Sequence, residues 1–161
     1  QAGGHRGMFD PEAPDEALET LPLLARLRGI GLPLIAAGGI MTRDDAQAAI
    51  EAGAVAVQCG TAFLRAPEAA SSAAHREALS RARTVMTRAI SGRPARCMEN
   101  LFTAIEGDHA PDYPVAYDAG KALNAAAMAR GETGYGAFWA GSGAAQAVAR
   151  PAAETVAAIS P

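Results

Sequence analysis

Residues 33–63, which read PLIAAGGIMTRDDAQAAIEAGAVAVQCGTAF, decide the fold class of this chain. One short apolar run, residues 33–37, leads directly into Gly38-Gly39, and a second run, residues 54–57, leads into residues 58–61, Gln-Cys-Gly-Thr. Each run has the length of a buried strand, and the sequence between them has the length of a helix. Strands separated by a helix pair in parallel, so the stretch predicts an α/β architecture.

The helices on either side of the first strand have recognisable ends. Leucines at positions 18, 21, 24 and 27 recur at helical spacing, and Asp15-Glu16 places acidic residues where a helix begins. Between the two strands, Thr42 with Asp45 three positions later has the pattern of a capping box. Residues 15–63 therefore predict helix, strand, helix, strand and the start of another helix.

The second half of the chain, after Pro67, has a different pattern. It is rich in alanine, contains turn residues between its helix-like stretches and shows no internal repeat. We expect residues 1–66 to form βα units and residues 67–161 to form a mainly helical extension packed on them. The expected elements are a loop over Met8–Pro14, helices over Ser71–Arg88, Met98–Ile105 and Val115–Arg130, a turn-rich connector over Ser91–Arg96, and a last helix over Ala144–Ile159 interrupted at Pro151.

Composition excludes several classes of protein. The chain has 161 residues, half of them apolar, so it can bury a core, and its net charge of −3 gives no electrostatic case for binding nucleic acid. No apolar run approaches the roughly 20 residues of a membrane span. Cys59 and Cys97 lie in different segments without metal-type spacing, which predicts reduced thiols in a cytoplasmic protein.

Two glycine loops are candidates for binding a phosphate. In a parallel barrel, ligands bind where the strands end, and the common phosphate site uses the loops after the last two strands. Gly38-Gly39 and Gly60-Thr61 fit that description, because glycine lets the backbone approach a phosphate and Thr61 adds a hydroxyl group. The alternative is that these glycines only form tight turns between strand and helix. Two such loops on consecutive strands favour the phosphate.

A histidine near the start of the chain is the candidate proton-transfer group. His5 lies between Gly3-Gly4 and Gly7, which predicts a loop with no helix or strand of its own. Imidazole titrates near neutral pH and therefore suits proton abstraction. The other histidines are weaker candidates: we expect His75 on an exposed helix face, and His109, beside Asp108 and Asp112, in a solvated loop. We predict no metal site.

Five stretches resemble the nitronate monooxygenase family, whose members are FMN-dependent TIM barrels. The resemblance runs in order along nearly the whole chain. One departure is Gln1, where the family usually has Glu. The matching stretches are Gln1–Gly7, Pro33–Ile40, Val57–Phe63, Ser91–Arg96 with Asn100, and Trp139–Gly143.

The resemblance implies a fold, a reaction and a set of roles. The fold is the C-terminal part of a (β/α)8 barrel, and the reaction is oxidation of a nitroalkane or its nitronate by O₂ to a carbonyl compound and nitrite. His5 corresponds to the catalytic base. Gly3 and Gly39 correspond to glycines that contact the flavin, while Gln58, Cys59, Gly60 and Thr61 correspond to the segment around the FMN phosphate.

The early strands of such a barrel do not precede His5 in this sequence. We therefore expect either that a missing N-terminal half is supplied by another chain or that this chain is a fragment that dimerises or aggregates. Two alternative functions remain open. One is a flavin-dependent enoyl-acyl-carrier-protein reductase, which shares the barrel and a similar histidine loop. The other is a non-catalytic barrel fragment.

Overall fold

The computed structural model describes residues 1–10, 12–81 and 83–161. Positions 11 and 82, which fall in the predicted loop Met8–Pro14 and the predicted helix Ser71–Arg88, lie outside the described residues. The helices and strands are β1 (Gly4–His5), α1 (Thr20–Leu27), β2 (Ile35–Ala37), α2 (Arg43–Glu51), β3 (Ala56–Gln58), η1 (Thr61–Phe63), α3 (Ala73–Ala78), η2 (Leu79–Arg81), β4 (Thr84–Thr87), β5 (Ala95–Met98), α4 (Val115–Met128), η3 (Ala144–Gln146) and α5 (Ala152–Ile159).

The predicted βα pattern of residues 33–63 is confirmed. Strands β2 and β3 pair in parallel, with Ile35 opposite Ala56 and Ala37 opposite Gln58. Helix α2 connects them and begins with a complete capping box: the Thr42 hydroxyl accepts from the Asp45 N–H, and the Asp45 carboxylate accepts from the Thr42 N–H. The two glycine loops therefore leave the same edge of one small parallel sheet.

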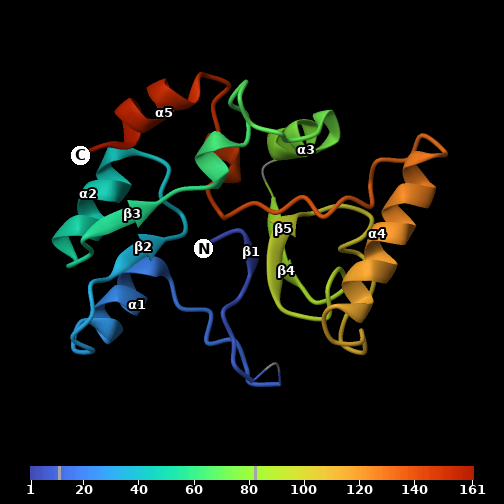
Figure 1. Ribbon diagram of the computed structural model, residues 1–161, viewed down its shortest axis with the longest axis horizontal. Coiled ribbons are helices and arrows are strands. Elements are labelled where there is room, and N and C mark those ends of the chain that lie inside the picture. Colours follow the sequence, from blue (N-terminus) through green and yellow to red (C-terminus); the bar gives the residue numbers. More distant parts are fainter. Residues whose placement is uncertain (11, 82) are drawn as a thin grey trace.

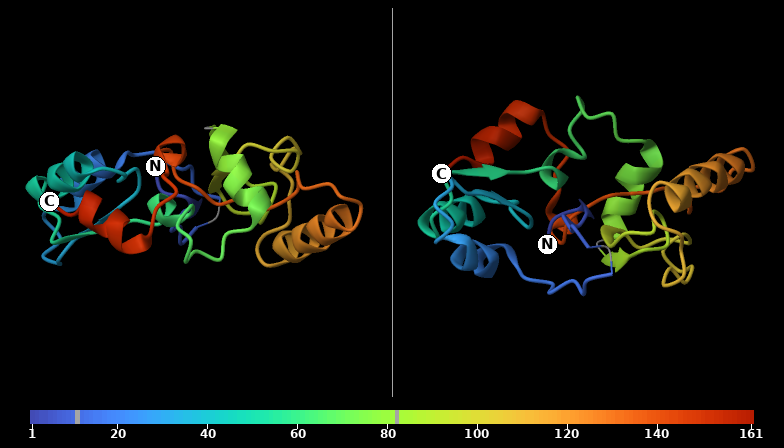
Figure 2. Two further views of the ribbon diagram at one scale, coloured as in Figure 1. Left: turned by 90° about the horizontal axis from the view of Figure 1, so that it is seen from above. Right: turned by 60° about the horizontal axis from the view of Figure 1, so that its bottom comes forward.

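A second sheet is antiparallel and has the order β1-β5-β4. Figures 1 and 2 show the elements in two groups: α1, β2, α2, β3 and α5 on one side, and α3, β4, β5 and α4 on the other. The N-terminal segment with β1 runs between the two groups (Figure 1). Strand β1 pairs with β5, placing His5 opposite Ala95, so the first residues of the chain belong to the sheet of its second half.

Two predictions for the second half are wrong. Among its described residues, the predicted helix Ser71–Arg88 is helical in α3 and η2, and Thr84–Thr87 near its end form β4. The predicted short helix Met98–Ile105 starts on the last residue of β5 and continues as turns. The physical reason is that Thr84 to Thr87, rich in β-branched residues, pair with Ala95 to Met98 across the Ser91–Arg93 turn. The predicted helix Val115–Arg130 is confirmed as α4.

Two local predictions near the N-terminus also need correction. His5 is not in a free loop, because it forms the two-residue strand β1. The helix expected from Asp15 begins only at Thr20. The Asp15 carboxylate accepts a hydrogen bond from the Ala17 N–H at 2.9 Å, and Ala17 has a positive φ of 52°, so the chain turns there before the helix starts.

The main core joins the two ends of the chain. Ala36, Ala46 and Ala49 of the βα units pack in one buried cluster with Ala147 and Ile159 from the C-terminal region. Helix α5 lies against α2 in this cluster, as Figure 1 shows. None of the helices among the described residues combines the length and apolar character that crossing a membrane requires.

Candidate functional site

A cavity of about 290 Å³ lies where the β2 and β3 loops meet the N-terminal segment and residues 139–143. Its lining includes every residue that the sequence singled out for cofactor binding: Gly3, Gly38, Gly39, Gln58, Cys59, Gly60 and Thr61. These residues come from three separate stretches of the chain. Parallel pairing of β2 with β3 places two of the stretches side by side, and the chain start closes the third side.

Glycine is required at Gly38 and Gly39 for reasons of backbone shape and packing. Both have positive φ, 118° and 74°, which residues with a side chain rarely adopt. A Cβ atom at Gly38 would lie 2.7 Å from the backbone nitrogen of Ala2. The loop after β2 is therefore shaped to receive the N-terminal segment closely.

Gly60 is a different case. Its φ is −113°, an ordinary value for any residue, and a Cβ atom there would meet nothing within 4 Å. Neither backbone strain nor packing explains a glycine at this position. Because Gly60 has no side chain, the wall of the cavity is open at this position. A ligand can therefore approach the backbone there.

Thr61 joins two walls of the cavity. Its Oγ accepts a hydrogen bond from the Gly141 N–H at 2.8 Å, which ties the β3 loop to the segment that follows Trp139. The hydroxyl proton of Thr61 is not used in that bond. Thr61 therefore keeps a hydroxyl proton that it can donate to another partner.

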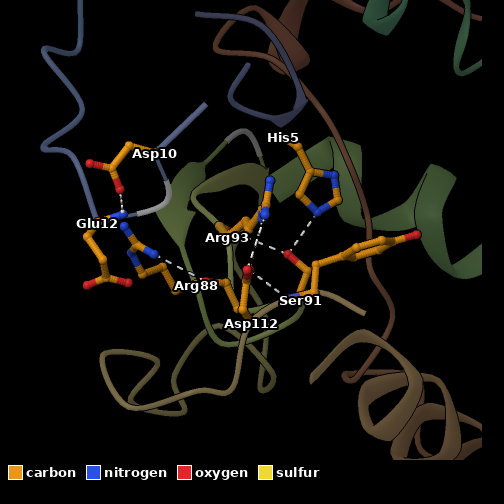
Figure 3. A network of polar contacts seen from close by, with 9 residues as sticks. His5, Asp10, Glu12, Arg88, Ser91, Arg93 and Asp112 are labelled. Carbon is orange, nitrogen blue, oxygen red and sulfur yellow. Dashed lines mark hydrogen bonds and ion pairs between the residues drawn. The ribbon is translucent and has the colours of Figure 1, made fainter. Parts of the chain in front are cut away.

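His5 is adjacent to the cavity without being part of its lining. The His5 ring centroid lies 5.1 Å from that of Trp139, and Trp139 lines the cavity. The His5 Nε2 atom also lies 2.8 Å from Ser91 Oγ. Figure 3 marks this contact with a dashed line. The structure thus brings the predicted proton-transfer group close to the cavity that the predicted phosphate loops line, with its ring beside that of Trp139.

The surroundings of His5 favour its neutral form. Partial burial lowers the pKa of its imidazole, and the positive charge of Arg93 lowers it further. A neutral imidazole has a lone pair that can accept a proton. The lowered pKa therefore suits His5 to act as a base rather than as a permanent positive charge.

Several residues around His5 were not predicted to belong to a site. The rings of Tyr113 and Tyr117 lie 6.3 Å and 6.4 Å from the His5 ring, and the Lys121 ammonium lies 4.4 Å from the centre of the Tyr117 ring. Ser91 is completely buried beneath His5. The available signal was the turn composition of residues 91–94, Ser-Gly-Arg-Pro, which marks a hairpin, but contact with His5 depends on distant pairing.

The other histidines do not join this site. His75 was expected to be exposed, yet it is half-buried and stacks on Phe138 with ring centroids 5.2 Å apart. Asp112, which the sequence placed near His109, instead forms a bidentate ion pair with Arg93. The Arg93 Nε and Nη2 atoms lie 2.9 Å and 3.1 Å from the two Asp112 carboxylate oxygens. Within residues 1–10, 12–81 and 83–161, no group of three or more His, Cys, Asp or Glu side chains is placed to hold a metal ion.

Comparison with known proteins assigns the family. The profile of the family described as nitronate monooxygenase matches residues 1–160. This chain belongs to the nitronate monooxygenase family. A nitronate monooxygenase from Paraburkholderia phytofirmans is 53% identical over 98% of this chain and 45% of its own length. A nitronate monooxygenase from Pseudomonas aeruginosa is 51% identical over 96% of this chain and 46% of its own length.

Two solved structures are also similar to this chain. A nitroalkane oxidase from Streptomyces ansochromogenes superposes with a TM-score of 0.90 at 39% identity, covering 98% of this chain and 48% of its own. FabK from Thermotoga maritima superposes with a TM-score of 0.74 at 28% identity, covering 98% of this chain and 50% of its own. Both are TIM-barrel enzymes. The chain spans about half the length of the relatives it matches.

Proposed function

We propose that this chain carries the FMN site and the catalytic base of an enzyme that oxidises alkyl nitronates and nitroalkanes with O₂. The products are a carbonyl compound and nitrite. The observation that carries the proposal is that all seven candidate cofactor-binding residues line one cavity. The His5 ring lies 5.1 Å from that of Trp139, which lines the same cavity. Membership of a flavin-dependent family supports the choice of cofactor.

The cavity residues fit a flavin that ends in a phosphate. Gly60 leaves space beside its backbone, since no atom lies within 4 Å of the position of its absent Cβ. Gly60 is the N-cap of η1 and Thr61 its first residue, so no preceding helical turn offers an acceptor to either backbone N–H group. Together with the Thr61 hydroxyl, they would bind the phosphate oxygens, while Gly38 and Gly39 would pass close to the flavin.

The bound flavin would supply the redox chemistry by accepting electrons from the substrate. This chain's own contribution is proton transfer. His5 takes the proton from the carbon next to the nitro group, a role that requires its neutral form. The rings of Trp139, Tyr113 and Tyr117 lie around the imidazole, with centroids 5.1 Å, 6.3 Å and 6.4 Å from its own.

In the same proposal, residues 1–66 supply the C-terminal βα units of a TIM barrel and residues 67–161 an extension packed on them. The parallel β2–β3 pair supports this arrangement, because a barrel of this kind is closed by parallel strands. The extension also carries the hairpin β4–β5 and returns to the βα units through α5, whose Ile159 lies in their core.

The test is to purify the protein at its natural length and measure its absorption spectrum, its O₂ consumption and its nitrite production with an alkyl nitronate. We expect a yellow protein that contains FMN and releases nitrite as O₂ is consumed. A yellow protein that reduces an enoyl thioester with a nicotinamide cofactor and produces no nitrite would favour the enoyl-acyl-carrier-protein reductase. A colourless protein inactive in both assays would favour a non-catalytic barrel fragment.

A further inference from the structure

Ser91 is a serine whose burial needs explaining. It has no exposed surface, and a buried hydroxyl destabilises a protein unless it is hydrogen-bonded. Ser91 Oγ has two partners, the Arg93 carbonyl oxygen at 3.3 Å and His5 Nε2 at 2.8 Å. Figure 3 shows the hydroxyl between the imidazole ring and the Arg93 turn.

The roles of donor and acceptor follow from these two partners. A carbonyl oxygen can only accept, so the hydroxyl proton of Ser91 is donated to Arg93. Ser91 Oγ is then left with its lone pairs and can only accept from His5. The Nε2 atom of neutral His5 must therefore carry the proton, which leaves the lone pair on Nδ1.

We propose that Ser91 is a positioning residue that holds His5 in the Nε2–H tautomer, so that Nδ1 is the atom that accepts the substrate proton. This inference rests on the proposed function. In the step it describes, the C–H bond next to the nitro group breaks and an N–H bond forms at Nδ1. The electron pair of the C–H bond becomes the C=N bond of the nitronate. The imidazolium that forms keeps its Nε2–H bond to Ser91.

The turn that carries Ser91 is fixed from several sides. The Gly92 N–H donates to the Arg88 carbonyl at 2.8 Å, which closes the turn. Gly92 has φ of 78°, and a Cβ atom there would overlap the Pro111 carbonyl, so the turn lies directly against the next loop. The ion pair between Arg93 and Asp112 holds the same two segments together. Ser91 is thus a rigid support for the ring of His5.

The first test is a direct measurement of the tautomer. Long-range ¹H–¹⁵N NMR of the ¹⁵N-histidine-labelled protein at its natural length, at a pH where His5 is neutral, distinguishes a protonated ring nitrogen from an unprotonated one. We expect Nε2 protonated and Nδ1 unprotonated. A His5 protonated at Nδ1 would overturn the proposal. This measurement needs neither a variant nor turnover, so it is independent of whether nitronate is oxidised.

The second test is kinetic and uses Ser91→Ala, with the surface variant Ser80→Ala as control. We expect Ser91→Ala to keep its flavin and to lose about 10-fold in rate with a neutral nitroalkane. With the pre-ionised nitronate, which has no proton to give, the rate should change by less than about twofold. Equal loss with both substrates, or no loss with either, would overturn the positioning role.

A conservative variant separates positioning from general structural damage. Ser91→Thr keeps the hydroxyl and should retain most of the neutral-substrate rate. Ser91→Cys keeps the approximate volume but is a weak acceptor, so it should behave like Ser91→Ala. A Ser91→Cys variant as fast as wild type with the neutral substrate would contradict the proposal. If the wild-type protein oxidises no nitronate at all, the proposed function is wrong. The NMR measurement would still show independently whether Ser91 holds His5 in the Nε2–H tautomer.

Discussion

The Nε2 atom of His5 lies 2.8 Å from Ser91 Oγ, although 86 positions of sequence separate the two residues. The pairing of β1 with β5 brings them together, since it sets His5 opposite Ala95, four residues beyond Ser91. The candidate base is thus oriented by the β4–β5 hairpin, while the cavity beside it is built by the β2 and β3 loops. In the proposed function, the base and the cavity therefore act together only when these two parts are docked.

Gly60→Val should abolish FMN binding without lowering the stability of the fold. The backbone at Gly60 has φ of −113°, which valine tolerates, but the side chain would fill the space that we assign to the phosphate. The check is the flavin-to-protein absorbance ratio together with the melting temperature, both measured at natural length. Unchanged flavin content would contradict the phosphate assignment.

Two glycine variants serve as controls for that experiment. Gly39→Val should lose flavin and stability together, because φ is 74° there and a β-branched residue is strained in that region. Gly29→Val, at an exposed position with no atom within 4 Å of the added Cβ, should keep its flavin. Gly60→Val tests the loss of space for the phosphate alone, whereas Gly39→Val also tests the loss of backbone freedom. Comparing the melting temperatures of the two variants separates these effects.

Arg93→Gln should move the acid limb of the pH–rate profile for neutral nitroalkanes to higher pH. Burial lowers the pKa of His5, and the positive charge of Arg93 lowers it further. Removing that charge lets the pKa rise, so the base becomes protonated, and inactive, at a higher pH than in wild type. The measurement is kcat/KM against pH, with the exposed Arg83→Gln as control. A limb that stays in place or moves to lower pH would show that Arg93 does not act on His5.

Thr42→Ala should lower the free energy of unfolding by about 1 kcal/mol, through loss of the capping box of α2. Urea unfolding measures the effect, and Asp44→Asn, an exposed neighbour outside the capping box, is the control. If Thr42→Ala lowers the free energy of unfolding no more than Asp44→Asn does, the capping box contributes nothing to stability.

The same capping box gives the fold a pH dependence with a defined sign. Burial by itself would raise the pKa of Asp45, but hydrogen bonds from Met41 and Thr42 outweigh it and lower that pKa. A carboxyl with a lowered pKa stabilises the fold above its unfolded pKa, and this contribution is lost as the pH falls through the folded value. Asp45→Asn should therefore show a smaller loss of stability on acidification than wild type.

A polypeptide limited to these 161 residues should bind FMN weakly or not at all and show no nitronate oxidation. Ile35 of β2 and Val55 beside β3 are 60% and 65% exposed, so the small parallel sheet leaves apolar side chains uncovered. We expect the preceding segment of a full-length relative, added in trans, to restore both properties. A monomeric, yellow and active 161-residue protein would contradict this expectation.

Much of the cavity could be predicted because its determinants are local. Gly38-Gly39 and Gly60-Thr61 each follow a short apolar run, and the parallel pairing of β2 with β3 places both loops at one edge. The capping box at Thr42 was equally local. These features depend on residues within a few positions of one another, where sequence patterns are most informative.

The surroundings of His5 could not be predicted, because they depend on contacts between distant residues. Thr84 to Thr87 lie in an alanine- and arginine-rich region that favours a helix, and only pairing with β5 makes them a strand. That misassignment concealed the hairpin, and with it the contact of Ser91 with His5. Tyr113 and Tyr117 lie near the imidazole because the loop before α4 and the start of α4 lie beside the Ser91–Arg93 turn, where Arg93 forms an ion pair with Asp112.

The most direct test of the account is the variant His5→Asn, made in the protein at its natural length and assayed with a neutral nitroalkane and with its pre-ionised nitronate. If His5 is the base, the variant keeps its FMN and loses about 10²–10⁴-fold in rate with the neutral substrate. The nitronate, whose proton is already gone, should be oxidised at close to the wild-type rate. Equal losses with the two substrates would contradict the assignment of His5 as the base beside the flavin cavity.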